Sequence, residues 1–314
     1  MLNRRHIRVK VMQTIYAMGC KEKNDLQVEG KFVNDSIAQV YNLYLLMLDM
    51  MVEVHAFAKA HSEKVSKKIL ATEEDKNPNT KFIENEVLVK LSDNALLQDE
   101  LDKRKLKNWR MDDEYVAVIY NELVESELYD AYMNNEEAGF KSAKNFIIKW
   151  YTELIAPNDK LYDYIEDNRL TWIDDLPIVN MAILKRLQKV KPNSPESLFL
   201  PSLFKNDDDR GFSIELLERT VSNSVFLSDE IEKNTPNWDK ERIADVDFVL
   251  IKMALCEFLK FPSIPVKATI NEYLEIAKEY STPKSSIFIN GILDKLVKEY
   301  EKGNKFMKEG RGLE

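Results

Sequence analysis

The sequence predicts an all-α protein. Of its 314 residues only 8 are glycine and 10 are proline, which is few for a fold that depends on tight hairpin turns. Leucine, isoleucine, lysine, glutamate and methionine are abundant, and most of these residues favour helices. Neither glycine-rich phosphate-binding motif, G-x-G-x-x-G or G-x-x-x-x-G-K-[ST], occurs in the chain. The sequence therefore argues against a nucleotide-binding fold.

Composition limits the class of protein further. The length suggests two domains, or one domain with a large insertion. The apolar runs are shorter than the roughly 18 to 20 residues that cross a bilayer. The two cysteines, Cys20 and Cys256, lack the spacing of a metal site or a disulfide framework. The three histidines are scattered, and we expect His55 and His61 at the surface. These features predict a cytoplasmic protein without a membrane span, metal or cofactor.

The charge is unevenly distributed. The net charge is −9, yet residues 1–20 contain four cations and no acid, so the remaining 294 residues carry −13. These cations are Arg4, Arg5, Arg8 and Lys10. An acid-free, arginine-rich N-terminus also fits a mitochondrial presequence, but this one lacks serine. Its apolar residues form two helical stripes, which favours a packed helix over 4–18 with a basic first part.

Between 34 and 190 the apolar periodicity predicts a series of helices. They are expected at 34–70, 84–108, 112–135, 138–154, 158–167 and 175–190. A polar loop with Pro78 occupies 72–82, and Asp112 and Asp113 are cap candidates for the helix that follows them. The stretches 191–201 and 205–211 are rich in Pro, Asn, Ser and Asp, which makes them the candidate domain boundary.

The pattern is sharper after this boundary. An amphipathic helix is predicted at 212–233, with one apolar face turned toward the core. A helix that is apolar almost all round follows at 245–260, as expected for a central buried helix, and another is expected at 266–280. Thr282 and Pro283 suit an N-cap and a first helical position, so the last helix should run to about Tyr300 before a frayed tail. The inward residues of 212–233 are Ile214, Leu217, Val221, Val225 and Ile231.

A faint internal repeat relates two parts of the chain. The spacing from Phe146 to Trp172 equals that from Phe212 to Trp238, and each tryptophan precedes a similar helix start. The similarity fits either a duplication or two helical hairpins that obey the same packing rules.

Two separated segments carry a family resemblance. The first is RRHIRVKVMQTIYA (4–17), and the second is ADVDFVLIKMALCEFLKFPSIPVKATINEYLEIAKEYSTPKSSIFINGILDKL (244–296). Together they resemble the NusB family of bacterial transcription antitermination factors over about 1–20 and 210–300. The resemblance implies two small helical bundles, here with an additional helical insertion. The expected domains are the arginine-rich helix at 1–20, the insertion at 21–204, the C-terminal helical domain at 205–302 and the tail at 303–314.

The resemblance also implies a function. Members of the family bind the boxA element of nascent RNA jointly with the ribosomal protein NusE, and they help RNA polymerase to read through terminators on ribosomal RNA operons without catalysing a reaction. With 54 acids, carboxylate pairs arise by chance, and none here is distinguished as a catalytic pair. The alternative is a helical scaffold that binds proteins through its acidic surface and has lost RNA binding.

The family's RNA-binding positions fall on two parts of this chain. Arginine forks bind phosphates and stack on unpaired bases, and free N–H groups at a helix start suit a phosphate. Relatives can carry an acid where Lys284 stands, and Phe288 could offer a stacking face or simply pack in the core. The expected RNA-binding residues are Arg4, Arg5, His6, Arg8, Lys10, Lys284, Ser285, Ser286 and Phe288.

The resemblance places the NusE contact on Tyr16 and Asp247. Tyr16 lies on the second apolar stripe of the first helix, and Asp247 lies in the first turn of the predicted central helix. An acid at that position also stabilises a helix start through the helix dipole, and both roles are compatible.

Overall fold

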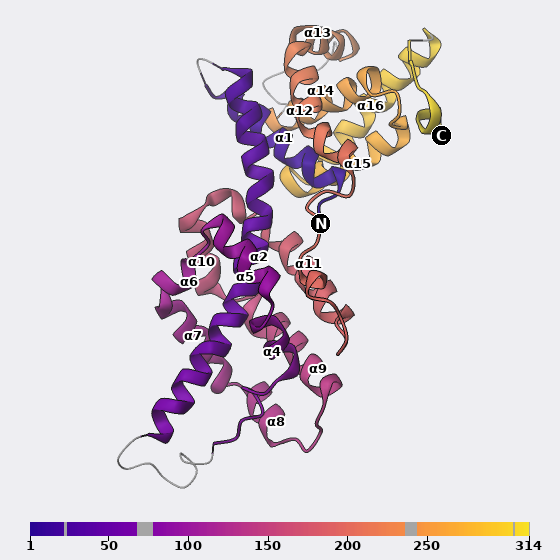
Figure 1. The fold of residues 1–314 in the computed structure, drawn as a ribbon. Helices are drawn as coiled ribbons and strands as arrows, with labels where there is room; N and C mark the ends of the chain where they lie inside the picture. The colour runs from indigo at the N-terminus through magenta and orange to yellow at the C-terminus, as the bar shows by residue number, and fades with distance from the viewer. Residues whose placement is uncertain (22–23, 68–77, 236–243, 304, 314) are drawn as a thin grey trace. The chain divides into compact units, whose positions relative to one another are not determined.

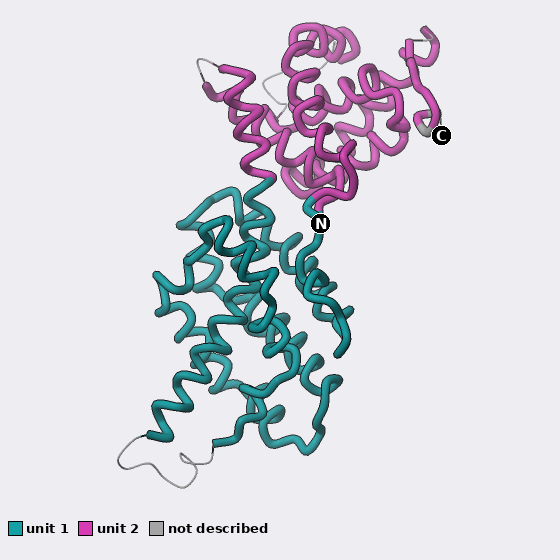
Figure 2. Tube along the Cα trace, in the orientation of Figure 1, with its two compact units in different colours: residues 1, 38–203 teal, residues 2–37, 204–314 magenta. Residues whose placement is uncertain are grey.

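The chain folds into helices. The computed structural model describes residues 1–21, 24–67, 78–235, 244–303 and 305–313 (Figure 1), and within these ranges it contains no strand. The described residues form two compact units (Figure 2). Unit 1 comprises residues 1 and 38–203, and unit 2 comprises residues 2–37 and 204–314. The prediction of an all-α fold with an extra helical region is confirmed.

Unit 1 is built around part of one long helix. That helix, α2 (Leu26–Ser66), begins in unit 2 and continues into unit 1. Shorter helices surround it, with 3-10 or π turns between some of them. They are α4 (Glu86–Ser92), α5 (Ala95–Arg104), α6 (Asn108–Met111), α7 (Asp113–Val124), α8 (Glu127–Asn134), α9 (Phe140–Trp150), η1 (Tyr151–Ile155), α10 (Asp159–Asn168), η2 (Leu170–Trp172), α11 (Leu176–Lys189) and η3 (Glu196–Phe199).

Helix α2 is a core helix. By length and apolar composition it could cross a membrane, but 78% of its most apolar window is buried inside the protein. Aromatic side chains fix other elements to its backbone: Trp109 Nε1 donates to the Leu46 carbonyl at 2.7 Å and Trp172 Nε1 to the Gln39 carbonyl at 3.0 Å. Tyr44 OH donates in turn to the Phe199 carbonyl at 2.8 Å. The polar ends of these three aromatic side chains thus tie neighbouring elements to the central helix.

Two predicted helices of unit 1 are each divided in the structure. The segment predicted as 84–108 breaks at Asn94, whose side-chain oxygen accepts from Leu97 N at 2.9 Å. The segment predicted as 112–135 breaks at Ser126, whose Oγ accepts from Tyr129 N at 3.2 Å. Asn and Ser side chains bond locally to the backbone and so favour helix starts over helix interiors. Asp112 is the N-cap residue of α7, as predicted, but its side chain forms no hydrogen bond with the first backbone N–H groups of the helix.

His55 contradicts the expectation that it lies at the surface. Its side chain is fully buried, with Nδ1 2.7 Å from Ser92 Oγ and Nε2 2.7 Å from the Ile83 carbonyl. The carbonyl can only accept, so Nε2 carries the proton and Nδ1 accepts from the serine. Burial lowers the pKa of this ring, which keeps it neutral. His61 is exposed, as expected.

Unit 2 contains the two segments that carried the resemblance. Its central helix is α14 (Asp245–Lys260), which contacts α1, α12, α13, α15 and α16, as predicted for a helix that is apolar on nearly all sides. The start of α2 completes the unit. The other elements are α1 (Arg4–Gly19), α12 (Asp207–Ser222), α13 (Ser224–Asn234), α15 (Val266–Tyr280), α16 (Ser285–Lys302) and η5 (Gly310–Leu313).

Three predictions for unit 2 were wrong in detail. The segment 212–233 breaks at Asn223, which leaves Val225 78% exposed at the start of α13. Helix α16 begins at Ser285, so Thr282 and Pro283 precede the helix. The tail is not frayed where the structure describes it, because Lys308 Nζ donates to two carbonyls that end α14. Trp238 lies outside the described residues, so the suggested repeat remains a hypothesis.

Candidate nucleic-acid interface

The start of α1 is capped by a reciprocal pair of side chains. Asn3 Oδ1 accepts from His6 N at 3.1 Å, and His6 Nδ1 accepts from Asn3 N at 3.3 Å. Burial, aided by the neighbouring Arg5, lowers the pKa of His6 to about 4. The ring is therefore neutral near pH 7, so it closes the helix end and adds no charge for a phosphate. A contact between His6 and RNA would therefore not rely on charge, and the expectation that His6 is one of the RNA-binding residues stays a prediction.

Arg8 lies in the core of unit 2. Its side chain is 3% exposed, and its Nε and Nη2 contact the two oxygens of Glu257, itself 0% exposed, at 2.6 and 2.8 Å. Thr269 and Tyr273 also donate to that carboxylate, at 3.2 and 2.8 Å. Burial alone would lower the pKa of Arg8, but the Glu257 carboxylate raises it above its usual value. Arg8 therefore holds α1 on α14 and α15, and a direct contact with RNA does not fit this structure.

Arg4 and Arg5 reach the surface and are already paired. Arg4 Nε lies 2.7 Å from Asp209 Oδ1, and its guanidinium lies over the Phe212 ring at 4.8 Å. Arg5 Nε and Nη2 donate to the two oxygens of Glu272 at 2.9 and 3.1 Å. Their side chains keep 34% and 36% of their exposure. A ligand with phosphates could therefore reach both guanidiniums only in competition with these carboxylates.

The sequence placed a basic tip here, but the fold surrounds it with acids. Asp207 and Asp208 stand beside Asp209 in the first turn of α12, and Glu275 and Glu279 act on Arg5 from α15. Lys10, the remaining predicted cation of α1, is 4% exposed. Of the α1 positions expected to contact RNA, the structure therefore leaves Arg4, Arg5 and the uncharged His6 partly accessible and encloses Arg8 and Lys10.

The predicted RNA-binding residues at the start of α16 also include both accessible and buried side chains. Lys284 is exposed, and Ser286 and Phe288 are half-buried. Ser285 is 3% exposed and its Oγ donates to Asp247 Oδ2 at 2.7 Å. Helix α16 has no side-chain cap, so Lys284 and Ser286 flank a helix N-terminus whose first N–H groups can attract an anion.

Asp247 anchors a turn. Its side chain is 4% exposed, and besides Ser285 it accepts from Ser281 Oγ at 2.6 Å. It thus ties α14 to the connection between α15 and α16. The expected direct contact between Asp247 and NusE does not fit this burial. The sequence did not reveal this cluster because Ser281 and Ser285 lie 34 and 38 residues after Asp247, and only folding brings them together.

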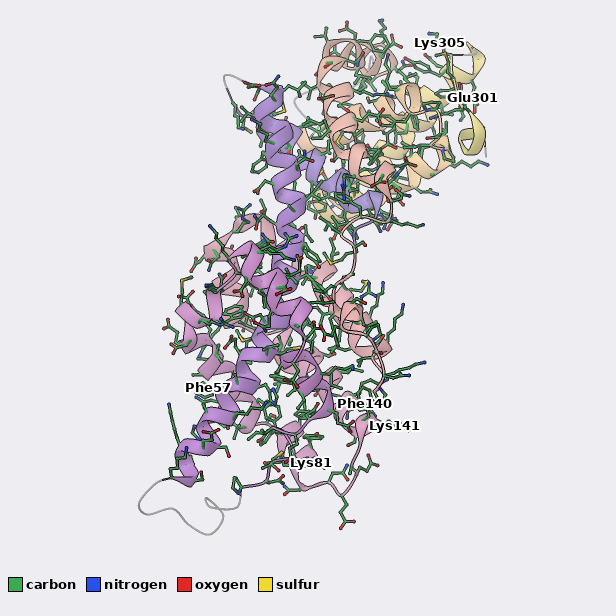
Figure 3. All side chains as sticks on the ribbon, in the orientation of Figure 1. Phe57, Lys81, Phe140, Lys141, Glu301 and Lys305 are labelled. Atoms are coloured by element: carbon green, nitrogen blue, oxygen red, sulfur yellow. The ribbon has the colours of Figure 1, made fainter. Side chains whose placement is uncertain are left out.

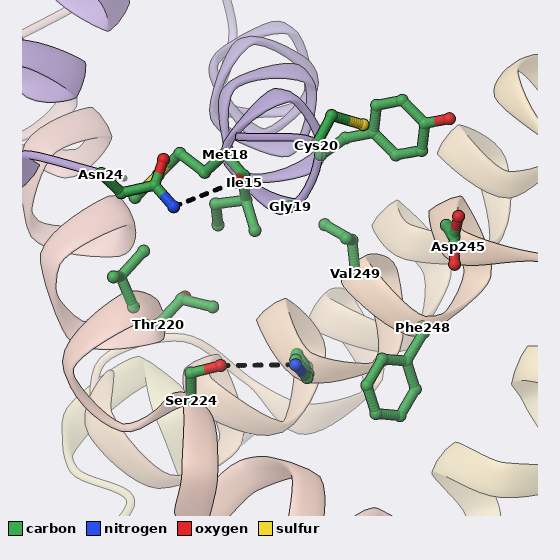
Figure 4. A pocket seen from close by; sticks show the side chains of 13 residues that line it. Ile15, Met18, Gly19, Cys20, Asn24, Thr220, Ser224, Asp245, Phe248 and Val249 are labelled. Carbon is green, nitrogen blue, oxygen red and sulfur yellow. Dashed lines mark hydrogen bonds between the residues drawn. The ribbon is translucent and has the colours of Figure 1, made fainter. Parts of the chain in front are cut away.

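Tyr16 borders a cavity of about 350 Å³ in unit 2 (Figure 4). Its side chain is 40% exposed. The acid in this cavity is Asp245 rather than Asp247, and the cation is Lys252, whose Nζ donates to Ser224 Oγ at 3.3 Å. Burial lowers the pKa of Lys252. The sequence analysis missed Asp245 and Lys252, although their seven-residue separation places them near one face of a helix.

No group of three or more potential metal ligands occurs among the described residues. The arrangement is one of ion pairs, helix ends and an open cavity, which suits binding.

Comparisons with known proteins cover the C-terminal part of this site, from α12 to most of α16, but the family model does not extend to α1. The model of the NusB family matches residues 181–298. A protein of Salinibacter ruber is 38% identical over 111 residues, which are 35% of this chain and 69% of that protein. A protein of Chloroherpeton thalassium is 38% identical over 104 residues, 33% of this chain and 49% of its own. A protein of Thermodesulfovibrio yellowstonii is 39% identical over 95 residues, which are 30% of this chain and 63% of that protein.

All three relatives are named transcription antitermination protein NusB. The chain thus spans between about half and about two thirds of their lengths. No solved structure matches it. Because the Salinibacter match is 38% identical and covers 69% of that relative, the chain belongs to the NusB family.

Proposed function

We propose that this protein is a cytoplasmic transcription antitermination factor that binds boxA-type RNA together with NusE, and that it supports read-through by RNA polymerase on ribosomal RNA operons without catalysing a reaction. The observation that carries this proposal is the packing of the arginine-bearing α1 against α14 and α15 within unit 2. These are the same segments that the sequence relates to the NusB family.

Two cations of α1 carry the proposed RNA contact. Arg4 and Arg5 lie one residue apart in the first turn of α1 and remain about one-third exposed. Each phosphate neutralised on a single strand contributes about −0.7 to the log–log salt slope of binding. Two such contacts predict a slope of about −1.4, to which Lys284 can add. This weak site explains why a partner that extends the RNA contact would be needed.

The proposed NusE contact is centred on Tyr16. A half-exposed tyrosine beside an open cavity offers apolar area and a hydroxyl, a combination that is common at protein interfaces. Asp247 would influence the same surface through the helix it anchors, since its carboxylate is enclosed by Ser281 and Ser285.

Fluorescence anisotropy tests the proposal. A labelled boxA-type RNA is titrated with the full-length protein at two salt concentrations, with and without NusE. We expect salt-sensitive binding that NusE strengthens and that Arg4→Ala/Arg5→Ala weakens. The matched control is Arg104→Ala/Arg110→Ala, because these arginines of unit 1 are also partly exposed and paired with glutamates.

The structure also gives a reason to test the scaffold alternative. The two accessible arginines, Arg4 and Arg5, are both paired with carboxylates, as in a surface that does not bind an anionic ligand. If wild-type protein binds NusE but no RNA under any condition, the scaffold is the correct account. If Arg4→Ala/Arg5→Ala binds RNA as tightly as the wild type and the control variant do, Arg4 and Arg5 do not form the RNA-binding site.

A further inference from the structure

Two adjacent helices of unit 1 carry cations that the proposed function does not use. The stretches 138–152 and 176–195 contain no Asp or Glu, in a chain with a net charge of −9. Helices α9 and α11 lie within these stretches and contact each other, and Lys144 Nζ donates to the Gln188 carbonyl across their junction at 3.3 Å. The seven cations are Lys141, Lys144, Lys149, Lys185, Arg186, Lys189 and Lys191.

The lysines lie on the outward sides of both helices. On α11, Lys185 and Lys189 are exposed and four residues apart, which separates them by about 40° around the helix axis. On α9, Lys141 is exposed near the start of the helix (Figure 3), and Lys144 is half-buried at the junction with α11. The opposite sides of both helices are apolar and buried in unit 1. Lys191 follows the end of α11 and is exposed.

These cations are not neutralised. None of the seven forms an ion pair with an acid in the described part of the chain, whereas Arg4, Arg5 and Arg8 all do. Acids occur at the edges. The hollow beside Phe140 is bordered by Glu84, Glu86, Asp93 and Glu196, and Glu137 lines another hollow with Lys149. We define the α9–α11 basic face as the five lysines away from that second hollow, namely Lys141, Lys144, Lys185, Lys189 and Lys191.

Glu196 is already engaged. Its Oε2 accepts from Leu96 N at 3.2 Å, and Asn94 Nδ2 donates to its carbonyl at 3.0 Å. The carboxylate therefore caps the start of α5 and forms no ion pair with the lysines. The positive charge of the α9–α11 basic face remains available to an anionic partner.

We propose that the α9–α11 basic face binds the phosphate backbone of RNA that flanks the boxA-type element, without reading its bases. The proposal rests on the proposed function, because that function brings RNA to the protein. Lysine binds phosphate as a point charge and gives no planar fork for a base edge. On α9 and α11, which the structure describes in full, the large exposed apolar side chain is Met181, so there is no exposed aromatic platform for stacking.

The lack of a wide exposed apolar face on α9 and α11 argues against a membrane surface as the partner of the α9–α11 basic face. A helix that lies on a bilayer needs a wide exposed apolar face. The apolar faces of α9 and α11 are instead buried, through residues such as Phe146, Trp150, Ile183 and Leu187.

Binding measurements with two RNAs test the inference. One RNA contains the boxA-type element alone, and the other adds about 20 nucleotides of unstructured flank, in native and scrambled versions. The variant Lys185→Gln/Lys189→Gln/Lys191→Gln is compared with the control Lys103→Gln/Lys107→Gln/Lys160→Gln, which removes three exposed lysines elsewhere in unit 1. Anisotropy is measured with full-length protein and NusE over a series of salt concentrations, and vesicles of anionic lipid form a separate arm.

We expect wild type to bind the flanked RNA more tightly than the short one, equally for native and scrambled flanks. The α11 variant should lose this advantage and lower the salt slope for the flanked RNA by about 2, at about 0.7 for each phosphate contact. The control variant should keep wild-type values.

The remaining outcomes separate the two proposals. If wild type binds the short RNA and the α11 variant keeps the full advantage of the flank, the inference is overturned and the proposed function stands. If wild type binds neither RNA, both fail. Loss of vesicle binding in the α11 variant, with RNA binding unchanged, would overturn the inference in favour of a membrane surface.

Discussion

The buried ion pair between Arg8 and Glu257 makes a quantitative prediction about unit 2. Removing one partner of a buried pair costs about 3 to 5 kcal/mol, because the other charge is left without compensation. In Arg8→Met the Glu257 carboxylate keeps its hydrogen bonds from Thr269 and Tyr273. We therefore expect a loss near the lower limit, about 3 kcal/mol. Arg4→Met breaks a pair that is one-third exposed on the arginine side and should cost less than about 1 kcal/mol.

Hydrogen exchange of the full chain, read by mass spectrometry, measures this difference. Peptides from α14 report the opening free energy of unit 2, and peptides from α9 provide a reference in unit 1. Adding Glu257→Gln to Arg8→Met should recover part of the loss, since a neutral amide replaces the unpaired carboxylate. If Arg8→Met costs no more than Arg4→Met, or if α9 is affected equally, the assignment of Arg8 as the residue that holds unit 2 together is incorrect.

Two further substitutions test buried carboxylates. Asp49 is 2% exposed and its Oδ1 has no hydrogen-bond partner, and burial raises its pKa from 3.8 to about 7. Since the folded state binds this proton more tightly, unit 1 should lose stability as the pH rises from about 4 to 7, by about 4 kcal/mol at about 1.36 kcal/mol per pKa unit. Asp49→Asn should therefore stabilise α2 peptides above pH 7 and flatten the pH dependence of their exchange, and an unchanged profile would contradict this. Asp247→Ala removes the carboxylate that accepts from Ser281 and Ser285, whose hydroxyls keep their contacts with each other and with Thr282, and it should cost about 1 kcal/mol. Faster exchange at the start of α16 would show this loss, and Asp247→Asn should retain more of the protection.

Periodicity predicted the helices well where packing and local propensity agree. The central position of α14 followed from a segment that is apolar on nearly all sides, and α15 matched its predicted range. The errors occurred where short polar side chains interrupt an apolar pattern. Asn94 and Ser126 begin a new helix directly after the preceding one has ended, and Asn223 lies between α12 and α13. Periodicity alone does not register such a break. His55 was misplaced because a buried histidine needs two specific partners, Ser92 and Ile83, that only the tertiary structure identifies.

The candidate site was predictable as a set of positions but not as a set of roles. The sequence identified the cations of α1, yet Arg8 and its partner Glu257 are 249 positions apart. No local pattern shows which arginine is enclosed and which stays accessible. The α9–α11 basic face was missed for a related reason, because its cations come from two segments that meet only after folding.

The most direct test of the account is cross-linking of boxA-type RNA to the full-length protein in the presence of NusE, with the cross-linked peptides identified by mass spectrometry. The account predicts cross-links in the first turn of α1, at Arg4 or Arg5, and around Lys284, with none at the enclosed Arg8. Efficient cross-linking at other surfaces of unit 2, with α1 and the start of α16 unmodified, would contradict it.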